Sequence, residues 1–244
     1  MTDLGLNRVL EMSLPPAQSH RQPIRWYPGP LFRQVAPPVA LFALIVLAYG
    51  TRIADLGFYW DDWPNVWFFA VRGNAGIIDA FAQDRPFLSA IYILCMNLLG
   101  QSPLAWQVFG LFARWLCAVG FGWAFLALWP RQRFQVFAAT ALFALYPGFT
   151  QQWISVIYGQ AFLLYAALFF SLGLTWRQAR IPAVGRGQAL GWAFAAWVFS
   201  GFHIFSTEYF FGLELLRPLG LWLILSSVQD RLPLRQRLLR VLRL

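Results

Sequence analysis

The stretch LAWQVFGLFARWLCAVGFGWAFLALW, residues 104–129, decides the fold class. Arg114 is the only charged side chain within it. An α-helix rises about 1.5 Å per residue, so about 20 apolar residues cross the ~30 Å hydrocarbon core of a bilayer. The stretch is therefore long enough to span a membrane as a helix.

Apolar runs of this kind fill most of the chain. The others lie at 37–56, 86–100, 134–147, 160–176, 189–205 and 209–227. Hydrophobic residues make up 59% of the sequence and charged residues only 12%, whereas a soluble domain carries roughly 25% charged residues. Cys95 and Cys117 lie within the runs and form no CxxC pair, which points to buried free thiols rather than a zinc site. The composition predicts a multi-pass membrane protein.

The basic residues predict how the chain threads the membrane. All 19 are arginines, and most stand in short clusters between apolar runs, which argues against a nucleic-acid surface. If the short run 86–100 does not cross, six crossings place the clusters on one side. These clusters are Arg8 to Arg33, Arg131 with Arg133, Arg177 to Arg186, and Arg231 to Arg243. The opposite side then receives Asp55, Asp61, Asp62, Asp79, Asp84 and Glu208.

We therefore expect an all-α transmembrane bundle in the cell membrane, with about six crossings and both termini in the cytoplasm. Residues 1–34 form a polar tail, residues 35–228 the membrane module, and residues 229–244 an arginine-rich cytoplasmic tail. The first outer loop, residues 57–102, contains helices that lie on the membrane surface. Tyr59, Trp60, Trp63 and Trp67 favour that position, because Tyr and Trp prefer the headgroup level.

Asp61 and Asp62 are the first candidate site residues. One interpretation is that Asp62 caps a short helix over 63–72, since Trp63-Pro64 follows it. The other is chemical: a carboxylate at the membrane surface can take a proton from a nucleophile, and two together can hold a divalent cation such as Mg²⁺ or Mn²⁺.

Arg85 and the pair His203 and Glu208 extend the outer face. Arg85 either pairs with Asp84 or contacts a phosphate, because its fork of N–H groups matches phosphate oxygens. Glu208 lies beside Ser206-Thr207, a possible helix cap, and His203 is a helix-end histidine or a second polar group of the site.

Charged residues also occur inside the predicted crossings. Glu214 and Arg217 stand three residues apart, on one helix face, and predict an ion pair. Arg114 either extends toward the membrane boundary or meets an anionic lipid headgroup.

The layout resembles the N-terminal half of the GT-C superfamily of membrane glycosyltransferases. The acidic motif of its first outer loop looks like Tyr59-Trp60-Asp61-Asp62, and the segments that follow look like Arg85-Pro86, Gly100 and Ala113-Arg114. LFALYPGFTQQWISVIYG, residues 142–159, is similar to the family's third crossing and the next outer loop. The resemblance covers roughly residues 37–228. Family members have more crossings, so this chain is either a shorter module or a piece of a longer protein.

The resemblance implies a sugar transfer at the outer face from a polyprenyl-phosphate donor to an unknown acceptor. Asp61 or Asp62 would be the catalytic carboxylate or would hold a metal ion. Arg85 and Arg114 would bind the lipid phosphate, and Glu208 would be a second acid on the same face. Two other functions stay open: a non-catalytic membrane subunit or scaffold, and a transporter.

Overall fold

The computed structural model describes residues 30–146, 151–181 and 185–228. Every regular element in these ranges is helical, as the sequence predicts. The long helices are α1 (Pro30–Ile45), α2 (Asp62–Phe81), α3 (Pro86–Leu99), α4 (Pro103–Leu128), α5 (Arg133–Ala144), α6 (Ser155–Arg180), α7 (Arg186–Ser206) and α8 (Leu216–Val228). The π-helix η1 (Val46–Gly50) and the 3₁₀-helices η2 (Ile53–Asp55) and η3 (Glu208–Leu215) complete the order. Most of the two expected cytoplasmic tails lies outside the described residues.

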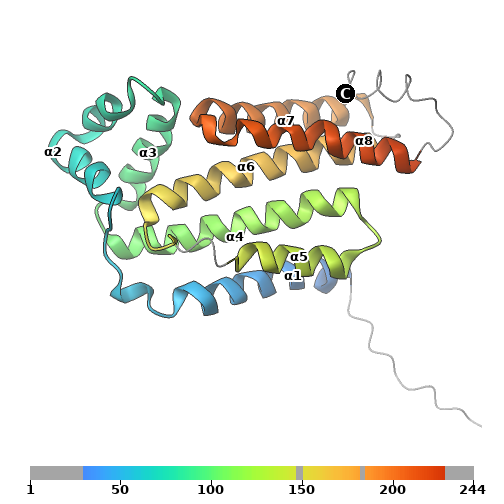
Figure 1. Cartoon of the computed structure of the whole chain (residues 1–244), viewed down its shortest axis with the longest axis horizontal. Helices are drawn as coiled ribbons and strands as arrows, with labels where there is room; N and C mark the ends of the chain where they lie inside the picture. Colours follow the sequence, from blue (N-terminus) through green and yellow to red (C-terminus); the bar gives the residue numbers. More distant parts are fainter. Residues whose placement is uncertain (1–29, 147–150, 182–184, 229–244) are drawn as a thin grey trace, which may run out of the picture.

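The helices α1, α4, α5, α6, α7 and α8 run along one direction, and α2 and α3 lie together at one end (Figure 1). We call this the loop end, comprising residues 55–86, 151–155 and 206–209. At the opposite end, which we call the arginine end, α4 and α6 finish and α5 and α7 begin (Figure 1). The arginine end carries Arg131, Arg133, Arg177, Arg180 and Arg186. Among the described residues, the acidic loop and two of the four predicted arginine clusters therefore lie at opposite ends, and most of the other two clusters falls outside these residues.

Four helical segments are long and apolar enough to cross a membrane. They are Pro103–Leu128, Ser155–Arg180, Arg186–Ser206 and Glu208–Ser227. The apolar helices Gln34–Gly50, Pro86–Leu99 and Arg133–Ala144 are shorter. Length and composition thus indicate association with a membrane.

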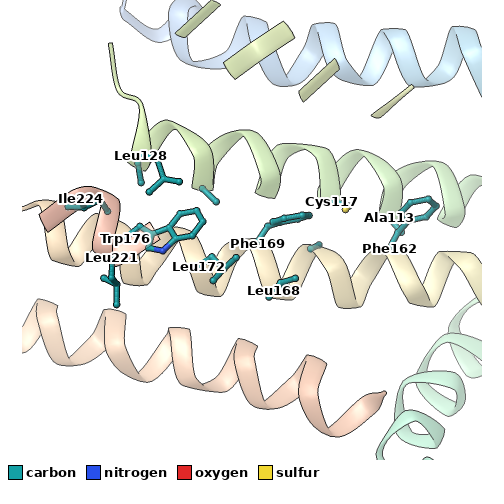
Figure 2. Close-up of a cluster of buried hydrophobic side chains, with 13 residues drawn as sticks. Ala113, Cys117, Leu128, Phe162, Leu168, Phe169, Leu172, Trp176, Leu221 and Ile224 are labelled. Atoms are coloured by element: carbon teal, nitrogen blue, oxygen red, sulfur yellow. The ribbon is translucent and has the colours of Figure 1, made fainter. Parts of the chain in front are cut away.

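The core lies where α4 packs along α6. Ala113, Cys117 and Ala124 repeat on one face of α4 and are buried, and their small side chains let the two helices approach closely. Figure 2 shows aromatic and aliphatic side chains of α6 filling this contact, with Trp176 near α8. A Cβ atom added at Gly220 of α8 would lie 2.2 Å from the Trp176 ring, so only glycine fits there.

The first loop forms helices at the predicted places. A short helix predicted over 63–72 appears as the first part of α2, which Gly73 interrupts with φ 59° and ψ −145°. Pro86 begins α3 as predicted, and α3 packs against α2. Trp63 and Trp67 stay exposed on α2, consistent with a helix that faces the headgroup region.

Candidate functional site at the loop end

Asp62 is fully buried, with 0% of its surface exposed. Its Oδ1 accepts hydrogen bonds from the backbone N–H groups of Val156, at 3.0 Å, and Ile157, at 3.2 Å. These N–H groups belong to the first turn of α6, which has no partner for them within its own helix. The expectation that Asp62 caps its own helix over 63–72 is therefore wrong: its carboxylate caps α6, about 90 residues further along the chain.

Burial raises the pKa of Asp62 from 3.8 to about 6, and the bonds from Ile157 and Val156 partly oppose the increase. Oδ2 of Asp62 is buried without a hydrogen-bond partner among the described residues. The hydrogen bonds of this carboxylate connect α2 to α6. Because the group is buried, its ionised form is energetically unfavourable.

Asp61 differs from its neighbour because it is exposed. Its backbone oxygen accepts a hydrogen bond from Asn65 Nδ2 at 2.8 Å, which fixes the start of α2. Trp60 precedes it with φ 44°, a left-handed conformation that is costly for a bulky residue. The rings of Tyr59 and Trp60 stand edge-on to Trp153, with centroids 4.9 and 5.3 Å away. This turn presents Asp61 to solvent and directs Asp62 inward.

Arg85 pairs with Glu208, not with the neighbouring Asp84. Its Nη2 lies 2.7 Å from Glu208 Oε1, and its Nε lies 3.2 Å from Oε2, so the contact is bidentate. Nη2 also donates to the Tyr209 hydroxyl at 2.9 Å, and the guanidinium lies 4.7 Å from the Tyr209 ring centre. The bond to Glu208 is the main reason that the pKa of Arg85 is raised.

An apolar groove lies between α3 and α7, next to this ion pair. Its volume is about 370 Å³, within the range of small-molecule sites, and its walls include Phe87, Ile91, Trp197 and Phe205. Phe87 follows Arg85 by two residues, and its ring centroid lies 5.4 Å from that of Phe205. Phe87 and Ser206 of the groove lie two residues from Arg85 and from Glu208 along the chain, so the groove begins near this ion pair.

The pKa of Tyr92 depends on charges from both the acidic turn and Arg85. Its phenol is buried in α3, and burial raises its pKa well above the usual range. The charges of Asp62 and Asp61 raise it further, whereas the charge of Arg85 lowers it. Asp61, Asp62 and Arg85 all belong to the loop end, and each of their charges acts on the Tyr92 phenol.

Arg114 is placed in the helix bundle, with 2% of its surface exposed. Its Nη1 donates to the Ala144 carbonyl at 3.1 Å, and its guanidinium lies 3.9 Å from the Tyr49 ring centre and 4.8 Å from that of Phe162. It stands 11 residues into α4, about 16 Å along the helix from Pro103. These contacts join α4 to η1, α5 and α6.

His203 is also buried, but its partner is Glu214 rather than Glu208. Its Nε2 lies 2.6 Å from Glu214 Oε1. Arg217 Nε donates to Glu214 Oε2 at 2.7 Å, which confirms the predicted ion pair. Ser200 donates to Glu214 at 2.9 Å, and Arg217 donates to Thr175 at 2.6 Å. These bonds tie α6, α7, η3 and α8 together, as polar groups in apolar surroundings favour, while Nδ1 of His203 is buried without a hydrogen-bond partner among the described residues.

No known family matches the chain. Comparison with curated proteins and with solved structures likewise gives no significant match.

Gln107 is a residue of this end that the sequence analysis missed. Its Nε2 donates to the backbone oxygens of Gly57, at 3.2 Å, and Trp153, at 2.8 Å, and so joins the first loop to the loop before α6. An amide inside an apolar run is the signal that points to such a role.

The expected metal site lacks a cluster of ligands. Within the ranges that the structure describes, no three His, Cys, Asp or Glu side chains are grouped to hold a metal ion. Asp61 faces solvent, whereas Oδ1 of the buried Asp62 accepts a hydrogen bond from α6.

Proposed function

We propose that the chain is a GT-C-type membrane glycosyltransferase, or the catalytic module of one, that uses a polyprenyl-phosphate sugar donor at the outer face. One observation carries the proposal: an exposed carboxylate, an arginine and an apolar groove occur together at the loop end. Such a set has the three chemical groups that a transfer from a lipid phosphate needs, namely a base, an anion partner and an apolar channel.

Asp61 is the catalytic carboxylate of the proposed reaction. Its exposed oxygens accept the proton of the acceptor hydroxyl as that oxygen bonds to the anomeric carbon of the sugar. The bond between this carbon and the phosphate oxygen breaks, and the lipid phosphate leaves with the electron pair. Asp62 is a positioning residue, because its carboxylate caps α6.

Arg85 stabilises the leaving phosphate in this proposal. A guanidinium offers paired N–H donors that match two phosphate oxygens, as they match the two oxygens of Glu208. The groove between α3 and α7 receives the first part of the isoprenoid chain, since its walls are almost entirely apolar. Arg114 then supports the bundle rather than the donor, because it contacts Tyr49 of η1, Ala144 of α5 and Phe162 of α6.

Six crossings with both ends in the cytoplasm of the cell belong to the same proposal. The direction shared by α1, α4, α5, α6, α7 and α8 supports this threading (Figure 1). The arginines of the arginine end support a cytoplasmic position for it, since arginine is enriched on that side. The loop end then faces outward, where polyprenyl-phosphate sugars are used.

The experiment is a sugar-transfer assay in proteoliposomes with Asp61→Asn, Asp62→Asn and Arg85→Gln. Asp61→Asn should lower the rate by about 10²- to 10⁴-fold, the usual contribution of a general base. Asp62→Asn should retain most activity, because an amide oxygen still accepts the bonds from Val156 and Ile157. Full activity of Asp61→Asn would remove this carboxylate from the mechanism and favour a non-catalytic subunit.

A further inference from the structure

The arginine end carries positive charge without an acidic partner among the described residues. Its arginines are Arg131, Arg133, Arg177, Arg180 and Arg186. Within the described ranges, every Asp and Glu falls in residues 55–84 or 208–214, which belong to the loop end or to η3. The ion pairs in these ranges also use other basic residues, namely Arg52, Arg72, Arg85, His203 and Arg217. An anion from outside the described residues can therefore balance the charge of the arginine end.

Two of these arginines are fixed against α4. Arg177 Nη2 donates to the Trp123 carbonyl at 3.3 Å, and its guanidinium lies 4.4 Å from the centre of the Trp123 ring. Arg180 Nη2 donates to the carbonyl of Leu128, the last residue of α4, at 2.9 Å. Both arginine side chains are half-buried. Because their packing already holds them, they lose little conformational freedom when a ligand binds.

A tight turn places two exposed arginines near Arg180. A backbone hydrogen bond of 3.1 Å closes the turn over residues 129–132, and α5 begins at Arg133. Arg131 lies three residues after Leu128, which is at most about 11 Å along the chain at 3.8 Å per residue. Arg131 and Arg133 are both exposed. One half-buried and two exposed guanidinium groups therefore gather where α4 ends and α5 begins.

Large apolar side chains stand exposed next to these arginines. Phe134, which follows Arg133, is 78% exposed. Ile181, which follows Arg180, and Trp129 at the start of the turn are exposed as well. An indole prefers the headgroup level of a bilayer, and transfer of an exposed phenyl ring from water to lipid chains is favourable. The arginine end thus combines cationic and apolar groups, as recognition of an amphipathic anion requires.

We propose that the arginine end binds the headgroup of an anionic phospholipid, and that the guanidinium groups of Arg131, Arg133 and Arg180 hold its phosphate. Basic pockets at the ends of membrane helices bind such headgroups in other proteins. A soluble anion would account for the arginines but not for the exposed Phe134 and Ile181 beside them. The inference goes beyond the proposed function, because none of these residues belongs to the loop end.

The orientation of the chain in the membrane does not by itself explain this arrangement. Orientation depends on positive charge in the connections between helices, and lysine supplies that charge as well as arginine does. A guanidinium differs from an ammonium because its planar fork of N–H donors matches two oxygens of a phosphate. Replacement of arginine by lysine therefore keeps the charge that orients the chain and removes the fork.

The measurement is equilibrium binding of phosphatidylglycerol to the full chain in neutral detergent, by native mass spectrometry, with phosphatidylcholine as the uncharged comparison. The wild type should bind phosphatidylglycerol more tightly than phosphatidylcholine. The double variant Arg131→Gln with Arg133→Gln should bind phosphatidylglycerol about 25-fold more weakly, about fivefold for each arginine removed. Arg131→Lys with Arg133→Lys, which retains the charge, should bind it about two- to fivefold more weakly.

Arg52→Gln with Arg72→Gln is the matched control, because it removes two exposed arginines whose partners, Asp55 and Asp79, lie at the loop end. It should bind phosphatidylglycerol as the wild type does. An equal loss in this control, or a wild type that does not distinguish the two lipids, would overturn the site. Wild-type affinity in the lysine variant would overturn recognition by the guanidinium groups. Binding of glycerol 3-phosphate as tight as that of phosphatidylglycerol would overturn the lipid as the ligand.

Discussion

Asp62→Asn tests whether burial of the ionised Asp62 carboxylate lowers the stability of the folded chain. The substitution keeps an oxygen that accepts from Val156 and Ile157 but removes the charge. A pKa raised from 3.8 to about 6 corresponds to roughly 3 kcal/mol that the ionised form costs the folded protein. The pKa of Asp62 is higher in the folded protein than in the unfolded chain. The stability that the protonated carboxyl contributes is therefore fully present below pH 3.8 and is lost as the pH rises to about 6.

The assay is unfolding of the purified chain in detergent between pH 4 and 8, followed by tryptophan fluorescence. At pH 7, Asp62→Asn should be more stable than the wild type by up to about 3 kcal/mol, and the difference should shrink toward pH 4. Asp61→Asn is the matched control, because an exposed side chain contributes little. A wild type that gains stability over Asp62→Asn as the pH rises would refute the reasoning, since the hydrogen bonds would then outweigh burial.

Four further substitutions test the packing and the threading. Gly220→Ala should destabilise the chain by about 1–3 kcal/mol in detergent unfolding, because its Cβ would overlap the Trp176 ring; a stability equal to wild type would contradict this packing. Glu214→Gln should cost about 1–3 kcal/mol in the same assay, because it leaves the arginine of a partly buried ion pair uncompensated, and a neutral effect would show that the network contributes nothing. Cysteines introduced as Asn74→Cys and Gln132→Cys should react with an impermeant thiol reagent from opposite sides of the membrane, and labelling from one side would contradict the threading.

Sequence reasoning predicted the helices because their signals are local. Each apolar run became a helix, and Pro86 and Gly73 mark a start and a break that follow from their backbone preferences. The ion pair of Glu214 with Arg217 was also local, since the two lie one helical turn apart.

Contacts between distant segments could not be predicted in this way. Asp62 and Arg85 each had a plausible partner nearby, in the helix over 63–72 and in Asp84. Both instead bind groups about 90 to 120 residues away, at the start of α6 and at Glu208. Only the packing of the helices decides between the near partner and the far one.

The adjacent acids were treated as a pair because the sequence gives no reason to separate them. The left-handed backbone at Trp60 precedes a turn that leaves one carboxylate in solvent and buries the next. A bulky residue with positive φ is unfavourable by local preference, so no local rule predicts it.

Native mass spectrometry of the chain purified in mild detergent tests the central claim most directly. The proposed function predicts a co-purified polyprenyl phosphate that is lost in Arg85→Gln. Ordinary phospholipid alone, unchanged by this substitution, would contradict it.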